Sequence, residues 1–334
     1  MFGSIMKVGI AITVKNEESL LRYNLLYHHY LGVENFYVFS DGSTDGTIQS
    51  IEHLPFVSIY PSLLAKDFKF SSEIREFLEK AETHNTARQC LNVCFAIEKG
   101  RECALNWLIS LDADELICLD FHNIKKGQLI DFFKSIKPNI EAVRFPTLEI
   151  VQRRLMYRNV FAEETLFKLQ KNRIRRRIYD PNKNKMWSLN GFYGHTYGKS
   201  ALRLTVDAKP KTVHEFIKYK GATLNTIKAG YLLHYILYSF DGFINQNKNK
   251  MDCPNTYLYG KSVAYVPTLL WRNIVNDPKY PLDYIKNYFE TNVMFNQNEV
   301  CRLRKNKYFG FFPKRANLVE VTSVKKTFNQ LLNL

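Results

Sequence analysis

Paired cysteines are what this sequence most clearly lacks. It holds six cysteines, at positions 90, 94, 103, 118, 253 and 301, and no two of them form a CxxC pair. Structural zinc sites and disulfide frameworks depend on such clusters, so neither is indicated and the thiols are expected to be reduced. Low-complexity tracts and internal repeats are also absent, which excludes a disordered chain and a solenoid. The composition, 46% hydrophobic and 24% charged, is that of a folded globular protein.

Long apolar runs are missing as well. No stretch approaches the roughly 18 apolar residues that a membrane-spanning helix needs. The first apolar run, at residues 8–14, has no charged and then apolar leader ahead of it. From these two absences we expect a cytoplasmic protein.

Positive charge is abundant and unevenly distributed. The formal net charge is +15, yet residues 1–150 hold 15 Lys and Arg against 20 Asp and Glu, so residues 151–334 carry the whole excess. Basic residues interleaved with aromatics concentrate in 151–187 and 299–326. Such segments attract anionic lipid, nucleic acid or a phosphorylated acceptor, although solubility explains them equally well. Without a helix-turn-helix, zinc-finger or RNP-like signature, we expect no nucleic acid partner and favour peripheral contact with a membrane.

Apolar runs alternate with amphipathic segments through the first third of the chain. VGIAITV, NFYVFS, FVSIY and NWLISL are short runs typical of strands covered on both faces. The segments between them predict helices at 16–33, 47–54 and 71–99. Asn16 is a candidate N-cap of the first helix, with Glu17 and Glu18 in its first turn. The alternation predicts an α/β fold with a Rossmann-like, mostly parallel sheet flanked by helices.

Polar turns follow three of the predicted strands. NEE follows the first strand, DGSTDGT the second, and DADE the strand at 106–111. Because the carboxyl ends of parallel strands meet at one edge of a sheet, the three turns are expected on one rim, where such folds bind ligands. In an extended stretch Asp112 and Asp114 would project to one side, as oxygen donors suited to Mg²⁺ or Mn²⁺. The alternative is a loop with helix-capping acids.

The order and spacing of these motifs resemble a known family. ITVKNEE, HHYLGVENFYVFSDGSTDGT and WLISLDADEL look like segments of the nucleotide-sugar glycosyltransferases of the GT-A fold, and most of all of the family 2-like group, which is related to family 92. The resemblance covers residues 7 to about 120. RFP, GKSALR, TVHEF and HY, between residues 144 and 235, echo further family segments more weakly. The resemblance implies a GT-A fold and metal-dependent sugar transfer from a nucleotide donor.

The resemblance also implies which residues bind the donor. Asn16 and Glu17 would edge the nucleotide pocket, and Asp41 would meet the base. Arg88 and Lys199 would reach the phosphates. Each has a structural alternative: a helix cap for Asn16, an Asx turn for Asp41, and a salt bridge or surface position for the two cations.

A metal site is implied in the same way. Asp112 and Asp114 would hold Mn²⁺ or Mg²⁺ against the donor diphosphate, and Asp112 would thereby also contact the donor. His214, in TVHEF, would complete the metal site. Its alternative role is that of a structural hydrogen-bonding histidine.

The catalytic base is the least defined part of the expected site. Family 2 enzymes usually invert at the sugar carbon and take a carboxylate base from the segment after the metal strand, with a further acidic motif and a Q-x-x-R-W sequence that are not evident here. Glu149, in RFPTLEIV, is the candidate base. Glu163, Glu164 and Glu215 remain open.

The second half of the chain is expected to be helical. Residues 1–220 would form one elaborated GT-A domain, and residues 221–334 a basic, aromatic, mostly helical region with helices at 280–294 and 323–334. That region would serve an acceptor site, a homo-oligomer contact or a membrane-facing surface, or would simply cap the core.

These expectations combine into one leading hypothesis. The chain would transfer a sugar from a UDP- or GDP-sugar to a glycan or lipid-linked acceptor in the assembly of a bacterial surface polysaccharide or lipopolysaccharide. One alternative is a nucleotidyltransferase, although VKNEE stands where such enzymes carry a Gly-rich basic motif. The other is a non-enzymatic basic scaffold that binds anionic polymer or membrane.

Overall fold

The computed structural model describes residues 6–69, 71–169, 174–194, 196–255, 258, 266–304, 308–309, 312–313 and 317–332. Contacts divide the chain into two compact units, each assembled from segments that are separated in sequence. Unit 1 comprises residues 1–147, 197–232 and 256–262, and unit 2 comprises residues 148–196, 233–255 and 263–334. This division differs from the expected one at residue 220, because the chain passes from one unit to the other more than once.

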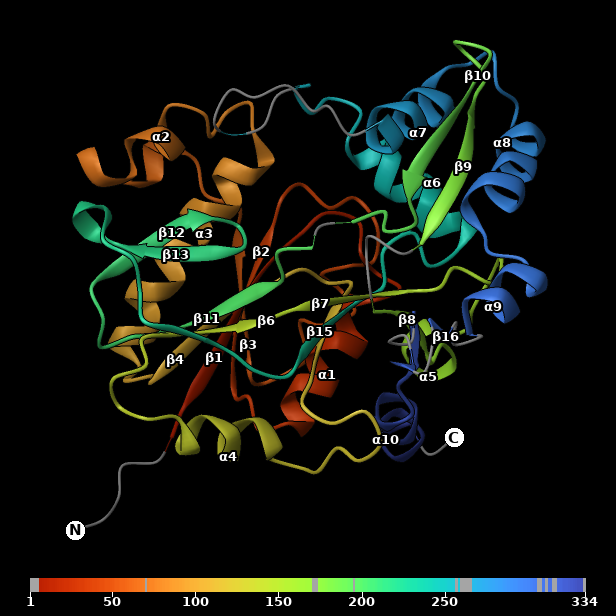
Figure 1. The fold of residues 1–334 in the computed structure, drawn as a ribbon. Helices are drawn as coiled ribbons and strands as arrows, with labels where there is room; N and C mark the ends of the chain where they lie inside the picture. The colour runs from red at the N-terminus through yellow and green to blue at the C-terminus, as the bar shows by residue number, and fades with distance from the viewer. Residues whose placement is uncertain are drawn as a thin grey trace. The chain divides into compact units, whose positions relative to one another are not determined.

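Unit 1 is built on a seven-stranded sheet (Figure 1). In spatial order its strands are β14 (Thr226–Lys228), β6 (Ala142–Phe145), β11 (Lys199–Arg203), β4 (Trp107–Leu111), β1 (Val8–Val14), β2 (Asn35–Ser40) and β3 (Val57–Pro61). The neighbours from β4 to β3 pair in parallel, as do β14 and β6, whereas β11 runs antiparallel to β4 and β6. The expected mostly parallel sheet is confirmed.

The order of the strands defines where a ligand would bind. From β1 the sheet grows outward through β2 and β3, and the chain then returns to add β4 on the other side of β1. Such a reversal opens a crevice at the carboxyl ends of the two central strands, the usual ligand position in open α/β sheets. The segments that follow β1, β2 and β4 are NEE, DGSTDGT and DADE.

Helices cover both faces of this sheet. Val93 of α3 (Asn85–Glu102) packs in one cluster with Leu108, while Phe133 of α4 (Gln128–Ser135) stacks near Trp107 with ring centroids 4.8 Å apart. Leu108 and Trp107 are consecutive in β4 and therefore point to opposite faces. Unit 1 also contains α1 (Leu21–Tyr30), α2 (Arg75–Leu78), the 3-10 turns η1 (Ala65–Asp67), η2 (Ser72–Ile74) and η4 (Tyr219–Gly221), and strands β5 (Glu115–Cys118), β12 (Ala208–Thr212) and β13 (Glu215–Lys218).

Unit 2 combines strands with the helical end of the chain. It holds β18 (Leu318–Glu320), β8 (Leu166–Lys168), most of β7 (Thr147–Ile150) and the end of β15 (Tyr231–His234), which are successive strands of a five-stranded sheet. It also holds the hairpins β9 (Arg175–Asp180) with β10 (Lys185–Asn190) and β16 (Tyr308–Phe309) with β17 (Phe312–Pro313). Its helices are α5 (Val160–Glu163), α6 (Phe240–Asn249), α7 (Val266–Asn276), α8 (Leu282–Tyr288), the π-helix η5 (Phe289–Val293), α9 (Gln297–Arg304) and α10 (Ser323–Leu331). An aromatic core that includes Phe243, Trp271 and Phe289 joins α6, α7 and η5. The expected helical C-terminal region is confirmed.

Two other expectations concern thiols and membrane spans. All six cysteines are free thiols, and three of them are buried. Over the described part of the chain, no helix combines the length and the apolarity needed to cross a bilayer.

Three predicted helices differ from the structure. The first begins at Leu21, so Asn16 is not its N-cap and no acid lies in its first turn. Residues 47–54 form successive turns with mixed i+3 and i+4 hydrogen bonds instead of a regular helix. The long helix expected at 71–99 is divided into η2, α2 and α3, with turns between Glu79 and His84.

Candidate functional site

The turns after β1 and β2 are hydrogen-bonded to each other. Asn16 adopts a left-handed conformation with φ of 58°, and its Oδ1 accepts from the backbone N–H of Thr44 at 2.8 Å. The N–H of Glu17 donates to Thr47 Oγ1 at 2.7 Å, and the N–H of Gly46 donates to a Glu18 carboxylate oxygen at 3.1 Å. NEE and DGSTDGT therefore lie together on one rim, as predicted, and the Asn16 side chain joins them instead of capping a helix.

Asp41 and Arg88 form a close ion pair beside this rim. The backbone N–H of Asp41 bonds the carbonyl of Val14 at 2.8 Å, which fixes the residue at the end of the first two strands. Arg88 of α3 donates to both Asp41 oxygens, from Nε at 2.7 Å and from Nη2 at 2.8 Å. A bidentate ion pair of this kind fixes the orientation of the carboxylate. The salt-bridge alternative for Arg88 is thus observed, with Asp41 as its partner.

The DADE segment is a turn, not an extended strand end. The N–H of Asp112 donates to the Glu115 carboxylate at 2.9 Å, and the N–H of Glu115 donates to the carbonyl of Asp112 at 3.2 Å. The expected strand alternation therefore does not decide where these side chains point. Asp112 keeps 34% of its side chain exposed, Asp114 is mostly buried and Glu115 is fully buried.

Lys199 joins the DADE turn from the neighbouring strand. It begins β11, which pairs antiparallel with β4, and its Nζ lies 2.9 Å from Asp112 Oδ2 and 3.6 Å from Glu115 Oε2. Only 1% of the side chain is exposed. Burial by itself would lower the pKa of Lys199, but the carboxylates of Asp112 and Glu115 outweigh it and hold the pKa above its usual value. A buried ammonium ion therefore sits against the carboxylates that the sequence singled out.

Sequence analysis did not identify the residues of α1 that hydrogen-bond to the backbone of the DADE turn and of β5. Asn24, buried in α1, donates from Nδ2 to the carbonyls of Ala113 at 2.9 Å and Glu115 at 2.8 Å. His28, one turn later and also buried, accepts from the N–H of Ile117 through Nε2 at 3.2 Å. No local signal marks the two residues, because Arg22 and His29 of the same helix are polar as well.

His28 is held in one protonation state. Burial lowers the pKa of His28 to about 3, against a smaller opposing effect of its hydrogen bond to the Asn24 carbonyl. The ring is therefore neutral, and because Nε2 accepts a hydrogen bond from the N–H of Ile117, Nδ1 carries the hydrogen that faces Asn24.

His214 contributes its backbone to the same region of unit 1. Its carbonyl accepts from Ser200 Oγ at 2.8 Å, and its ring stacks near Tyr197 with centroids 6.0 Å apart. Within the described ranges, no group of three or more His, Cys, Asp or Glu side chains is arranged to hold a metal. The set of Asp112, Asp114 and His214 is therefore not assembled as a three-ligand centre.

The chemistry of the remaining donors still suits a hard cation. Mg²⁺ and Mn²⁺ take carboxylate oxygens, and Mg²⁺ in particular is commonly held by one or two carboxylates together with substrate phosphates and water. Asp112 and Asp114 are two such groups in one turn, and Asp112 is part-exposed. Two carboxylates in one turn fit a divalent cation that takes its other ligands from outside the turn.

Glu149 does not have the surroundings of a catalytic base. Its carboxylate is fully buried in unit 2, where Lys168 Nζ donates to it at 2.5 Å. The backbone N–H groups of Tyr193 and Gly194 donate to the same carboxylate at 2.9 and 2.7 Å. A carboxylate enclosed and saturated in this way cannot meet an acceptor hydroxyl, so the expectation is corrected: Glu149 is one half of a structural ion pair.

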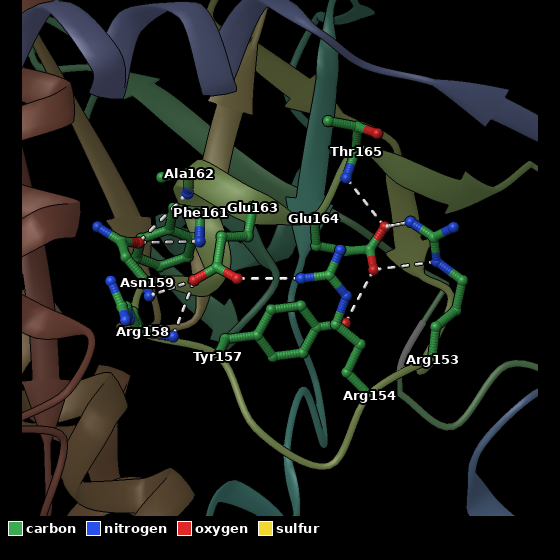
Figure 2. Close-up of polar contacts among 10 residues, drawn as sticks. All are labelled: Arg153, Arg154, Tyr157, Arg158, Asn159, Phe161, Ala162, Glu163, Glu164 and Thr165. Atoms are coloured by element: carbon green, nitrogen blue, oxygen red, sulfur yellow. Dashed lines mark hydrogen bonds and ion pairs between the residues drawn. The ribbon is translucent and has the colours of Figure 1, made fainter. Parts of the chain in front are cut away.

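Glu163 and Glu164 are likewise engaged in local structure (Figure 2). One Glu163 oxygen accepts from the N–H of Asn159 at 2.9 Å, and the other accepts from Arg154 at 3.0 Å. Glu164 is buried and accepts two hydrogen bonds from Arg153, at 3.2 and 2.6 Å. Glu163 stabilises the loop before α5 and the start of that helix, and Glu164 joins the loop to the backbone that follows the helix.

Glu215 remains more accessible but is strongly paired. Arg144 and Lys211 bind its two oxygens at 2.7 and 3.0 Å, and the three residues line a cavity of about 190 Å³ in unit 1. Burial would raise the pKa of Glu215, but the hydrogen bonds from Lys211 and Arg144 outweigh it and lower the pKa. An ionised carboxylate of lowered pKa is a weak proton acceptor.

Sequence comparison connects the chain with proteins of glycosyltransferase-like name. No protein-family model matches it. One glycosyltransferase-like protein of Arabidopsis thaliana is 24% identical over 245 residues, which cover 70% of this chain and 54% of the relative. A second from the same plant is 25% identical over 272 residues, which cover 76% of this chain and 52% of the relative. The chain thus spans about half the length of the curated relatives that it matches.

Two solved structures align with this chain only weakly. HddC from Yersinia pseudotuberculosis aligns with a TM-score of 0.32 at 9% identity, covering 72% of this chain and 97% of that one. Glucosyl-3-phosphoglycerate synthase from Mycobacterium tuberculosis, in complex with Mn²⁺, UDP and phosphoglyceric acid, aligns with a TM-score of 0.31 at 9% identity, covering 69% and 70%. TM-scores of this size carry no weight for the fold or the function of this chain. The names of the two sequence relatives agree with the family resemblance of the NEE, DGSTDGT and DADE motifs.

Proposed function

We propose that this chain is a glycosyltransferase of the GT-A type that takes its sugar from a nucleotide-sugar donor. One observation carries the proposal: NEE, DGSTDGT and DADE follow three adjacent parallel strands at the point where the strand order reverses. The glycosyltransferase-like names of the two plant relatives support the same reading. A donor of the UDP- or GDP-sugar class and a glycan or lipid-linked acceptor belong to the proposal.

Different residues of the rim would bind different parts of the donor. Asp41, oriented by Arg88, would accept hydrogen bonds from the base, and the turn at Asn16 and Glu17 would border the nucleoside. Lys199 would supply a fixed positive charge next to the diphosphate, because its raised pKa keeps the ammonium protonated at neutral pH.

A divalent cation is part of the proposal. Asp112 and Asp114 would hold Mn²⁺ or Mg²⁺, and the bound cation would supply positive charge to the departing nucleoside diphosphate. Lys199 balances these carboxylates and would keep Asp112 in position. Glu149 is no longer the proposed base, and no other residue takes that role here.

The finer features of the hypothesis depend on the resemblance of the sequence motifs. They are inversion at the sugar carbon, a role in assembling bacterial surface polysaccharide or lipopolysaccharide, and action at the inner face of the cytoplasmic membrane. They are tested by the anomeric configuration of the product and by the identity of the accepted glycan.

The first experiment is thermal stabilisation by nucleotides. A ligand that binds only the native state raises the melting temperature, and at a hundredfold excess over Kd it adds about 2.7 kcal/mol. We expect one of UDP, GDP and CMP to stabilise the protein in the presence of Mn²⁺ or Mg²⁺. Asp112→Asn together with Asp114→Asn should abolish the shift, whereas Asp131→Asn, an exposed acid of α4, should preserve it.

Two outcomes would contradict the proposal. Absence of stabilisation by every nucleotide, with and without metal, would leave a basic scaffold as the better explanation. Release of pyrophosphate from a nucleoside triphosphate, in place of UDP or GDP from a nucleotide sugar, would instead indicate a nucleotidyltransferase.

A further inference from the structure

The hairpin of β9 and β10 separates three consecutive arginines by strand alternation. Arg175, Arg176 and Arg177 begin β9, where successive side chains point to opposite faces. Arg176 is buried with Ile178 on the inner face, while Arg175 and Arg177 are exposed on the outer face. One sequence run thus supplies both an internal anchor and a charged surface within unit 2.

The inner face fixes the hairpin to the rest of unit 2. Arg176 donates to Glu299 Oε1 at 2.6 Å and to the carbonyl of Met294 at 2.8 Å, and its guanidinium lies 4.3 Å from the centre of the Phe295 ring. The backbone N–H of Tyr179 donates to Asn292 Oδ1 at 2.9 Å. The outer face is therefore presented on an anchored element.

The hairpin carries excess positive charge. Its exposed cations are Arg175 and Arg177 on the outer face, Lys183 in the turn, and Lys185, which lies opposite Asp180 in the register. Between residues 174 and 189 the only acid is Asp180, which is buried and bonded to the backbone of the turn and to Trp187. None of the four exposed cations forms an ion pair with any residue that the structure describes.

Apolar side chains accompany this charge. Met186 is 52% exposed and lies opposite Tyr179 in the register, so it shares the outer face with Arg175 and Arg177. Lys279 and Tyr280 both donate to Asn182 in the hairpin turn at 2.8 Å, which places the segment before α8 beside the turn (Figure 1). That segment leads into Leu282, which is 63% exposed.

We propose that the outer face of this hairpin is a docking surface for an anionic lipid bilayer. Each basic residue near such a surface contributes roughly 1 kcal/mol, and exposed apolar side chains enter the headgroup region. Single-stranded nucleic acid would need open aromatic rings for stacking, but Trp187 is half-buried with Lys185 Nζ 4.2 Å from its ring centre. This proposal deepens the membrane location that belongs to the proposed function, but vesicle binding can be measured without sugar transfer, so either proposal can fail alone.

Vesicle sedimentation of the full chain tests the proposal. We expect binding to vesicles that contain phosphatidylglycerol, little binding to pure phosphatidylcholine, and loss of binding at high salt. Arg175→Gln with Arg177→Gln should weaken partitioning by about tenfold or more. Met186→Ser should weaken it while leaving the salt dependence unchanged.

The matched control removes the same charge elsewhere. Lys125 and Lys126 are exposed residues of unit 1, and replacing both with Gln should leave vesicle binding near that of the wild type.

Three results would overturn the proposal. They are equal loss of binding in the hairpin variant and the lysine control, binding to pure phosphatidylcholine as strong as to anionic vesicles, and binding of single-stranded RNA without binding of anionic vesicles. The last result would reassign the hairpin to nucleic acid.

Discussion

At the scale of single residues, the candidate site depends on buried polar side chains that hydrogen-bond to its backbone as well as on its own acidic residues. Asn24 and His28 lie in α1, and both hold backbone atoms of the DADE turn or of β5. Each is fully buried, so its hydrogen-bond partners must come from the protein. The position of Asp112 is therefore determined partly by a histidine that no ligand would touch.

The low pKa of His28 predicts a pH-dependent stability. The unfolded chain binds a proton at His28 near pH 6.5, whereas the folded chain does so only near pH 3. As the pH falls below 6.5, the unfolded state gains a proton that the folded state lacks, so stability declines by about 1.4 kcal/mol per pH unit. At pH 5 we expect a loss of about 2 kcal/mol from this residue, measured by urea unfolding at pH 7.5 and pH 5.

The matching variant is His28→Gln, whose amide oxygen can still accept from Ile117. It should be less stable than the wild type at pH 7.5 but should lose about 2 kcal/mol less on acidification. If both proteins lose the same free energy between the two pH values, His28 is not the responsible group.

Sequence analysis identified the acids of the rim but not their supports, and the reason is physical. Asp112 and Asp114 follow an apolar strand directly, so their position at a strand end can be inferred from the local pattern. Asn24 and His28 occupy an amphipathic helix, where a polar residue in the apolar stripe looks like an ordinary interruption. Only tertiary contacts distinguish a polar residue that supports a turn of the site from an ordinary interruption of the stripe, and no local pattern encodes such contacts. Glu149 was misassigned for the same reason, since its partner Lys168 lies 19 residues away.

At the scale of elements, the RFP and GKS motifs meet between β6 and β11. Lys199 pairs with Phe145 in the register, and Gly198 precedes it with φ of 79°. A Cβ at Gly198 would lie 2.0 Å from the carbonyl oxygen of Phe145, a backbone atom that cannot move aside cheaply. The glycine is needed both for its conformation and for the close approach of the two strands.

This contact predicts different costs for two glycine substitutions. Gly198→Ala combines a left-handed conformation with a backbone clash, and we expect it to lower the free energy of unfolding by about 3 kcal/mol or more. Gly42→Ala has a similar φ of 75° but open space around its Cβ, so it should cost only about 1 kcal/mol. Urea unfolding measures both. Equal losses of unfolding free energy in the two variants would mean that β6 and β11 move apart easily enough to accommodate a methyl group.

Strands were predicted better than helices, because their signals differ in strength. Continuous apolar runs such as VGIAITV have few alternatives to a buried strand, and β1, β2 and β4 are found where they were expected. The segment 47–54 has the composition of a short helix, but hydrogen bonds from Glu17 to Thr47 and from Gly46 to Glu18 hold its start in turns. Contacts between distant turns thus override a weak local preference.

At the scale of the whole molecule, sequence patterns gave the α/β class and the helical C-terminal region but not the division into units. Units 1 and 2 are each assembled from separate segments, and the segment 148–196 lies between two parts of unit 1. Composition and periodicity describe neighbours in sequence, so they cannot reveal a unit whose parts meet only in space. The buried pair of Lys168 and Glu149 belongs to unit 2, whereas the rim turns belong to unit 1.

This division predicts that the two units respond separately to a local defect. Lys168→Met removes the partner of a fully buried carboxylate, which typically costs 3–5 kcal/mol. If the units open independently, hydrogen exchange measured by mass spectrometry should accelerate by about a hundredfold or more in β8 and α7 of unit 2, while β1, β2 and β4 of unit 1 keep their protection. Adding Glu149→Gln should restore part of the protection, because the buried charge is then gone. A parallel acceleration in both units would show that they unfold as one, and the destabilisation of unit 2 would then reach the rim turns after β1, β2 and β4.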